Sequence, residues 1–193
     1  MRKLVSPVLW FFLLVAAGCR QTSVPSASDA ARAKAGGSAA SAASGSPPPA
    51  GVPVKPQFSY VNTADVRARP QLLSGWHAIE DGAFRWTERE ARAVLLAPQD
   101  SPADFELRLF FPENHMRRAG GPVIVSVLIE GALFAQETYD RPGPYTLRRP
   151  VPPGTLAGPS VNVTLRVDRA VPPSDTDKRE LGAVVQGFGF LRL

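Results

Sequence analysis

Residues 104–111 read Asp-Phe-Glu-Leu-Arg-Leu-Phe-Phe, and apolar side chains stand at every second position, at Phe105, Leu107, Leu109 and Phe111. Successive side chains of an extended chain point to opposite sides, so this alternation gives one apolar face and one face that begins with Asp, Glu and Arg. The stretch therefore predicts a half-buried β-strand.

Residues 161–168 repeat the design, with apolar and polar side chains again in strict alternation. Residues 123–130 are more continuously apolar and β-branched, which predicts a central strand covered on both faces. Shorter runs predict further strands at residues 58–61, 84–87, 91–97, 133–139, 145–148 and 183–191.

Prolines separate these runs, for example at Pro98, Pro112, Pro122 and Pro159. Proline cannot donate to a strand ladder, so its placement supports the strand boundaries and argues against a long helix after residue 57. Residues 57–193 are long enough for one domain. The sequence therefore predicts an all-β fold, a single antiparallel β-sandwich of jelly-roll type.

The N-terminus has the composition of a secretory signal over residues 1–18. Arg2 and Lys3 precede an apolar stretch of roughly ten residues, about half of the ~20 needed to span a bilayer. Small residues then lead directly to Cys19, the one cysteine of the chain.

This segment resembles the lipobox of bacterial lipoproteins, on the residues Ala17, Gly18 and Cys19. The resemblance implies that Cys19 receives a diacylglycerol, becomes the new N-terminus and anchors the chain to a membrane. Two or three acyl chains hold a protein firmly on a bilayer, whereas one does so only marginally. Arg20, where an Asp would signal inner-membrane retention, implies the outer membrane. The alternative is a free thiol behind an ordinary cleaved signal.

Residues 19–56 consist mostly of Ser, Ala, Gly and Pro. Such a composition supplies too little apolar surface to offset the entropy of ordering the chain, so we expect a disordered tether after the lipidated cysteine. An Ala-rich helix over residues 27–43 is the alternative, weakened by Gly36 and Gly37.

Charge excludes one class of partner. Residues 57–193 carry 16 basic and 16 acidic side chains, so the folded part is neutral. Nucleic-acid binding needs a concentrated basic stripe, and we expect no nucleic-acid partner.

Three patches, at residues 75–87, 123–133 and 177–182, together resemble the galactose-binding-like jelly-roll module that is appended to some bacterial cell-surface glycosyltransferases. The resemblance covers about residues 70–193 and implies a β-sandwich. It carries over no ligand and no catalytic residue.

Two groups of residues are candidates for ligand binding. Trp76, Glu80, Arg85 and Trp86 combine indole rings with charged groups, as a glycan site requires. The alternative is packing, with both tryptophans in the core and Glu80 paired to Arg85 at a strand turn.

The second group lies in a predicted loop at residues 112–121. There His115, Arg117 and Arg118 could contact anionic groups or simply form a solvated hairpin tip.

A further acidic group lies near the C-terminus, at Asp175, Asp177 and Glu180. These residues lack calcium-loop spacing and lie beside Lys178 and Arg179, so a salt-bridged turn is preferred to a metal site.

The sequence predicts no catalytic residue, no cofactor and no metal. It has neither a Gly-x-Ser-x-Gly turn nor a phosphate-binding glycine loop. We therefore expect a non-catalytic binding module of the cell envelope, with a glycan as the favoured ligand. The alternatives are an accessory protein-interaction subunit of an envelope complex and, less favoured, a polysaccharide-active enzyme.

Overall fold

A computed structural model describes residues 54–99 and 102–193. The predicted signal peptide, Cys19 and nearly all of the predicted tether lie outside these residues. In the part of the chain that is described, no helix has the length and apolar character needed to cross a membrane.

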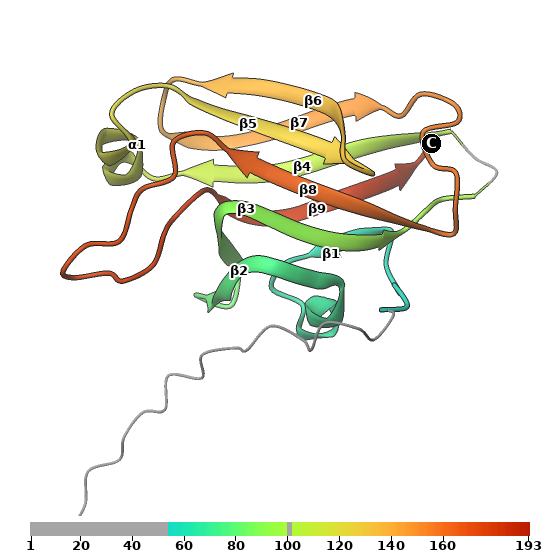
Figure 1. The fold of residues 1–193 in the computed structure, drawn as a ribbon, viewed down its shortest axis with the longest axis horizontal. Helices are drawn as coiled ribbons and strands as arrows, with labels where there is room; N and C mark the ends of the chain where they lie inside the picture. Colours follow the sequence, from blue (N-terminus) through green and yellow to red (C-terminus); the bar gives the residue numbers. More distant parts are fainter. Residues whose placement is uncertain (1–53, 100–101) are drawn as a thin grey trace, which may run out of the picture. The chain divides into compact units, whose positions relative to one another are not determined.

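The described residues form strands and two short helices, and the longest connection, residues 168–183, precedes the last strand (Figure 1). In chain order the elements are β1 (Tyr60–Asn62), η1 (Val66–Gln71), β2 (Leu72–Glu80), β3 (Phe84–Leu96), β4 (Ala103–Phe111), α1 (Glu113–Ala119), β5 (Val123–Ile129), β6 (Ala132–Tyr139), β7 (Gly143–Pro150), β8 (Ser160–Val167) and β9 (Val184–Arg192).

All strand pairs are antiparallel, in the order β6-β5-β8-β3-β9-β4-β7, with β1 added beside β9 and β2 beside β3. β3 belongs to both layers: its residues Glu90 to Leu96 pair with β8, and Arg85 and Trp86 pair with β9. A strand that changes partners in this way lets one sheet fold back over itself into two layers. The predicted all-β fold, a single antiparallel β-sandwich, is confirmed.

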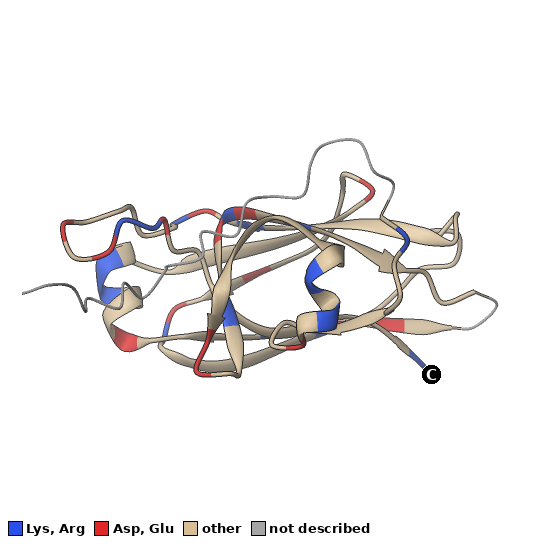
Figure 2. Ribbon diagram, turned by 90° about the horizontal axis from the view of Figure 1, so that it is seen from below, with Lys and Arg blue, Asp and Glu red and all other residues tan. Residues whose placement is uncertain are grey.

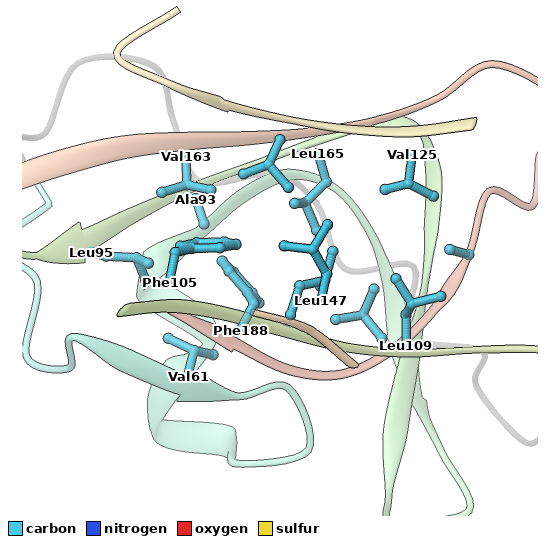
Figure 3. Close-up of a cluster of buried hydrophobic side chains, with 14 of the residues drawn as sticks. Val61, Ala93, Leu95, Phe105, Leu109, Val125, Leu147, Val163, Leu165 and Phe188 are labelled. Carbon is cyan, nitrogen blue, oxygen red and sulfur yellow. The ribbon is translucent and has the colours of Figure 1, made fainter. Parts of the chain in front are cut away.

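Apolar side chains from both layers meet in one core (Figure 3). Phe105 and Leu109 of β4 and Phe188 of β9 point toward Val163 and Leu165 of β8. Each of these five side chains is at most 3% exposed. Their burial follows from the alternation along β4 and β8, where every second residue is buried.

The layers are also joined where the edge strands β6 and β7 meet. Arg149 of β7 forms an ion pair with Glu137 of β6. Beside it, the rings of Tyr139 and Tyr145 pack with their centroids 4.6 Å apart. The β6 and β7 edges are therefore tied to each other, which limits their pairing with another chain.

The structure corrects several local predictions. Residues 112–121, expected to be a loop, contain helix α1, which begins after Pro112 and ends at Gly120 in the left-handed conformation. The short strands expected at 84–87 and 91–97 are one continuous strand, β3.

Two further differences concern strands. β2 was not among the predicted strands because bulges in its pairing with β3, after Leu72, Ser74 and Trp76, break the alternation. β5 has a neighbour on each side as predicted, but it is not covered on both faces throughout, since Ile124 and Ser126 are half-exposed.

Candidate functional site

Different segments of the chain lie at the two ends of the sandwich. At one end residue 58 accepts a backbone hydrogen bond from Leu96, and Leu193 donates one to Pro102, so the chain enters and leaves there. The β2–β3 turn, α1 and the β8–β9 connection lie at the other end, called the α1 end here (Figure 1). The candidate ligand-binding side chains other than Trp76 are found at or close to the α1 end.

Trp86 and His115, which come from separate candidate groups, lie together beneath α1. Their ring centroids are 5.2 Å apart, and Phe111 packs on the other side of His115 at 5.7 Å. Trp86 is 8% exposed and His115 is 3% exposed. Trp86 therefore fits the packing alternative. His115 is on the buried side of α1. It is therefore neither a contact residue for anionic groups nor part of a solvated hairpin tip, the two alternatives that the sequence suggested.

His115 has no hydrogen-bond partner for either ring nitrogen among the described residues. Burial, together with the nearby positive charge of Arg118, lowers its pKa from 6.5 to about 4. The ring is thus held neutral in an apolar environment.

Trp76 is half-buried and packs from β2 onto the core. Its ring lies parallel to that of Phe188, with centroids 5.2 Å apart and planes 10° apart. Its Nε1 donates to the backbone carbonyl of Arg92 at 2.9 Å. With one face against Phe188 and its N–H already used, Trp76 has a structural role, while its remaining exposed surface is open to solvent.

Glu80 and Arg85 are not paired with each other, contrary to the sequence interpretation. Arg85 is 5% exposed, and it donates to the backbone carbonyls of Thr63 and His77 at 2.8 and 2.7 Å. Glu80 instead forms an ion pair with Arg179 of the β8–β9 connection. Partners almost one hundred residues apart in sequence could not be read from local spacing.

Two of the patches that carried the sequence resemblance meet at this place. Arg179 also binds Asp177 through two nitrogens, at 3.0 and 2.9 Å, and lowers the pKa of that carboxyl to about 2. His77 donates from Nε2 to the carbonyl of Glu180 at 2.7 Å. These contacts fasten the β2–β3 turn to the β8–β9 connection.

The preferred salt-bridged turn is present in this connection, where Lys178 pairs with Asp175 in addition to the Arg179 contacts. Among the described residues, no three His, Cys, Asp or Glu side chains are placed to share a metal ion.

A second surface was not anticipated from the sequence: the outer face of the sheet β1-β9-β4-β7. Tyr60 of β1 lies over Gly187 of β9, where an added Cβ would come within 2.9 Å of the tyrosine hydroxyl. The ring crosses β9, and its hydroxyl donates to Glu106 of β4 at 3.2 Å. Burial, followed by the charge of Glu106, raises the pKa of Tyr60 to about 12.

Charged pairs continue this face across β4 and β7. Arg108 Nε lies 3.6 Å from Glu106, and Arg148 Nε lies 2.8 Å from Asp104. The carboxylates are 14% and 16% exposed, whereas the guanidinium side chains are 60% and 50% exposed. We call this surface the Tyr60 face, made of Tyr60, Asp104, Glu106, Arg108 and Arg148.

One sequence signal pointed to the Tyr60 face. Gly187 and Gly189 flank Phe188 inside a strand, and a glycine within a strand often marks the close approach of another group. At Gly189 an added Cβ would lie 2.2 Å from the carbonyl of Ser59, so β1 can pair closely with β9 only because the side chain is absent.

Comparison with known proteins gives structural similarities only. No protein-family model and no curated protein matches the chain. The structure is similar to BtGH115A, a GH115 4-O-methyl-α-glucuronidase with specificity for decorated arabinogalactans, at 11% identity and a TM-score of 0.45, covering 69% of this chain and 17% of that one.

It is also similar to the carbohydrate-binding module CBM36 in complex with calcium and xylotriose, at 13% identity and a TM-score of 0.42, over 69% of this chain and 100% of that one. A family 35 carbohydrate-binding module from an environmental isolate is similar at 12% identity and a TM-score of 0.36, over 62% of this chain and 91% of that one.

Proposed function

We propose that this protein is a non-catalytic glycan-binding module, tethered to a membrane of the cell envelope through lipid on Cys19. The Tyr60 face is the observation that carries the glycan proposal. The part of the proposal that concerns Cys19, the signal at residues 1–18 and the outer membrane rests on the sequence alone.

An aromatic ring held flat on a sheet suits a sugar. One side of the Tyr60 ring packs over the backbone of β9 at Gly187, and the residue stays partly exposed. The apolar C–H groups of a pyranose can then stack on the free side of the ring. Because the hydroxyl is fixed by Glu106, little conformational entropy is lost when a ligand binds.

The charged pairs supply the hydrogen-bonding groups of such a site. Sugar hydroxyls both donate and accept, so they need acceptors and donors side by side. On the Tyr60 face the carboxylates of Asp104 and Glu106 can accept, and the exposed guanidinium groups of Arg108 and Arg148 can donate. Each carboxylate lies beside a cation.

Binding can be tested by affinity gel electrophoresis of the full chain in gels that contain xylan, β-glucan, dextran or peptidoglycan fragments. We expect at least one polymer to retard the protein. Tyr60→Ala should abolish that retardation, and Arg148→Gln should weaken it several-fold. Trp76→Phe is the matched aromatic control and should behave as the wild type.

Three results would reject the proposed function. If none of these polymers retarded the protein and a stoichiometric envelope protein partner were recovered, the protein would be an accessory subunit. If Trp76→Phe lost retardation and Tyr60→Ala kept it, the site would be at Trp76. If the wild type broke down a polymer, the protein would be an enzyme.

The anchor has its own test. Mass spectrometry of the N-terminal peptide from the membrane fraction should show acyl chains on Cys19, and Cys19→Ser should release the protein into the soluble fraction. An unmodified Cys19 in membrane-bound protein would reject the anchor while leaving the glycan proposal open.

A further inference from the structure

Three arginines lie on or next to the C-terminal end of α1. Arg117 and Arg118 are exposed on the last turn of the helix, and Arg169 follows β8. Arg118 Nη2 lies 3.4 Å from the carbonyl of Pro172, and Arg169 Nη1 lies 3.5 Å from the carbonyl of Gly120. The two side chains therefore span the same junction between α1 and the β8–β9 connection. Figure 2 shows basic positions on this helix beside the basic and acidic positions of that connection.

The local charge of this arginine cluster (Arg117, Arg118 and Arg169) is weakly balanced. Asp168 is 3.8 Å from Arg169, and its other oxygen already accepts from the backbone N–H of Ile124 at 2.7 Å. Within the described residues, Arg117 and Arg118 have no carboxylate within 4.0 Å. By contrast, Arg92 and Arg166, on strand faces, both bind Glu90 at less than 3 Å.

The contacts that the cluster makes use only a few of its donors. Each guanidinium has five N–H groups, and the two hydrogen bonds to backbone carbonyls are long. Closing the end of a seven-residue helix needs no third arginine, because Gly120 already ends it in the left-handed conformation. Three like charges with free donors form a site for repeated anionic groups.

We propose that the arginine cluster binds an anionic polysaccharide through its carboxylate or sulfate groups. A polymer presents such groups at intervals, so one chain can reach all three guanidiniums. The cluster lies at the opposite end of the sandwich from residue 58. This inference is separate from the Tyr60 face and does not rest on it.

The experiment measures binding of the full chain to labelled dextran sulfate and polygalacturonate, with neutral dextran as the uncharged reference, by fluorescence anisotropy at 50 and 300 mM NaCl. We expect both anionic polymers to bind in a salt-dependent way. The triple variant Arg117→Gln, Arg118→Gln and Arg169→Gln should bind at least tenfold more weakly at the lower salt concentration.

A second triple variant serves as the charge-matched control. Arg67→Gln, Arg92→Gln and Arg166→Gln remove the same number of charges from exposed, ion-paired arginines and should change the affinity less than threefold. Arg117→Gln alone removes no hydrogen bond or ion pair among the described residues, and it should weaken binding about threefold even if the triple variant folds poorly. Neutral dextran has no anionic group for the cluster, so any binding of neutral dextran reports the Tyr60 face separately.

Equal losses in the two triple variants would contradict the inference, since binding would then follow net charge alone. Absence of binding to either anionic polymer would also contradict it. A third arm uses phosphatidylglycerol vesicles. If the cluster variant lost vesicle binding but retained polymer binding, the cluster would be a membrane contact and the assignment to a polysaccharide would be wrong.

Discussion

The indole ring of Trp76 lies face to face with the ring of Phe188, at 5.2 Å between centroids and 10° between planes. Trp76 belongs to β2, which pairs with β3, and Phe188 belongs to β9, which pairs with β4. The contact therefore connects β2, which is added beside β3, to the core.

Replacing Trp76 by Ala should lower the free energy of unfolding by about 2 to 3 kcal/mol, because the stacked, half-buried ring and its hydrogen bond to Arg92 are both lost. Chemical denaturation followed by circular dichroism measures this change. A loss below about 0.5 kcal/mol would mean that β2 is not held by this contact.

At Gly187 we expect a specific steric effect. In Gly187→Ala the new methyl group would lie 2.9 Å from the hydroxyl and 3.1 Å from a ring carbon of Tyr60, so the ring must move. Stability should fall by about 1 to 3 kcal/mol. Adding Tyr60→Phe to Gly187→Ala should recover part of this loss, and a double-mutant cycle measures the coupling. Strict additivity would show that Tyr60 does not lie over Gly187.

The sequence was sufficient for the fold class because alternation is a local property. Phe105, Leu107 and Leu109 are buried as their spacing predicted. Alternation did not reveal β2, where bulges break the period, and it did not reveal α1, whose seven residues are too few to show a helical period.

The candidate residues were harder to assign because a site depends on partners distant in sequence. Glu80 was placed at a strand turn correctly, but its partner is Arg179 and not Arg85. Tyr60 and Glu106 are 46 residues apart, and only the pairing of β1 and β4 with β9 brings them together. Burial of Trp86 and His115 likewise results from the packing of α1 over the end of the sandwich.

His115 should make stability depend on pH. In the unfolded chain its pKa is near 6.5, and in the folded protein it is about 4, so the unfolded state binds a proton first as the pH falls. Stability is thus fully present above pH 6.5 and is lost progressively down to pH 4. Between pH 7 and pH 5 this group should cost about 2 kcal/mol.

His115→Phe should remove most of this pH dependence and should raise stability at pH 7 by about 1 kcal/mol, because two unpartnered buried nitrogens disappear. Denaturation midpoints at pH 7 and pH 5 provide the measurement. His77→Gln is the control and should keep the pH dependence. If His115→Phe had the same pH profile as the wild type, the ring would not be buried as described.

The carboxyl of Asp177 should titrate with a pKa of about 2, because the Arg179 guanidinium donates to both of its oxygens. In Arg179→Gln this pKa should rise to near the ordinary value of about 3.9. Carbon-detected NMR titration follows the carboxyl directly. An unchanged pKa in the variant would mean that Arg179 does not hold the β8–β9 connection in solution.

The central claim is that Tyr60 presents one side of its ring to a sugar. Saturation-transfer difference NMR with the polymer that retards the protein tests this claim most directly. We expect saturation to reach the pyranose C–H protons in the wild type and to be lost in Tyr60→Ala, while both proteins keep the same melting temperature to within a few degrees. Equal transfer in the two proteins would contradict the account.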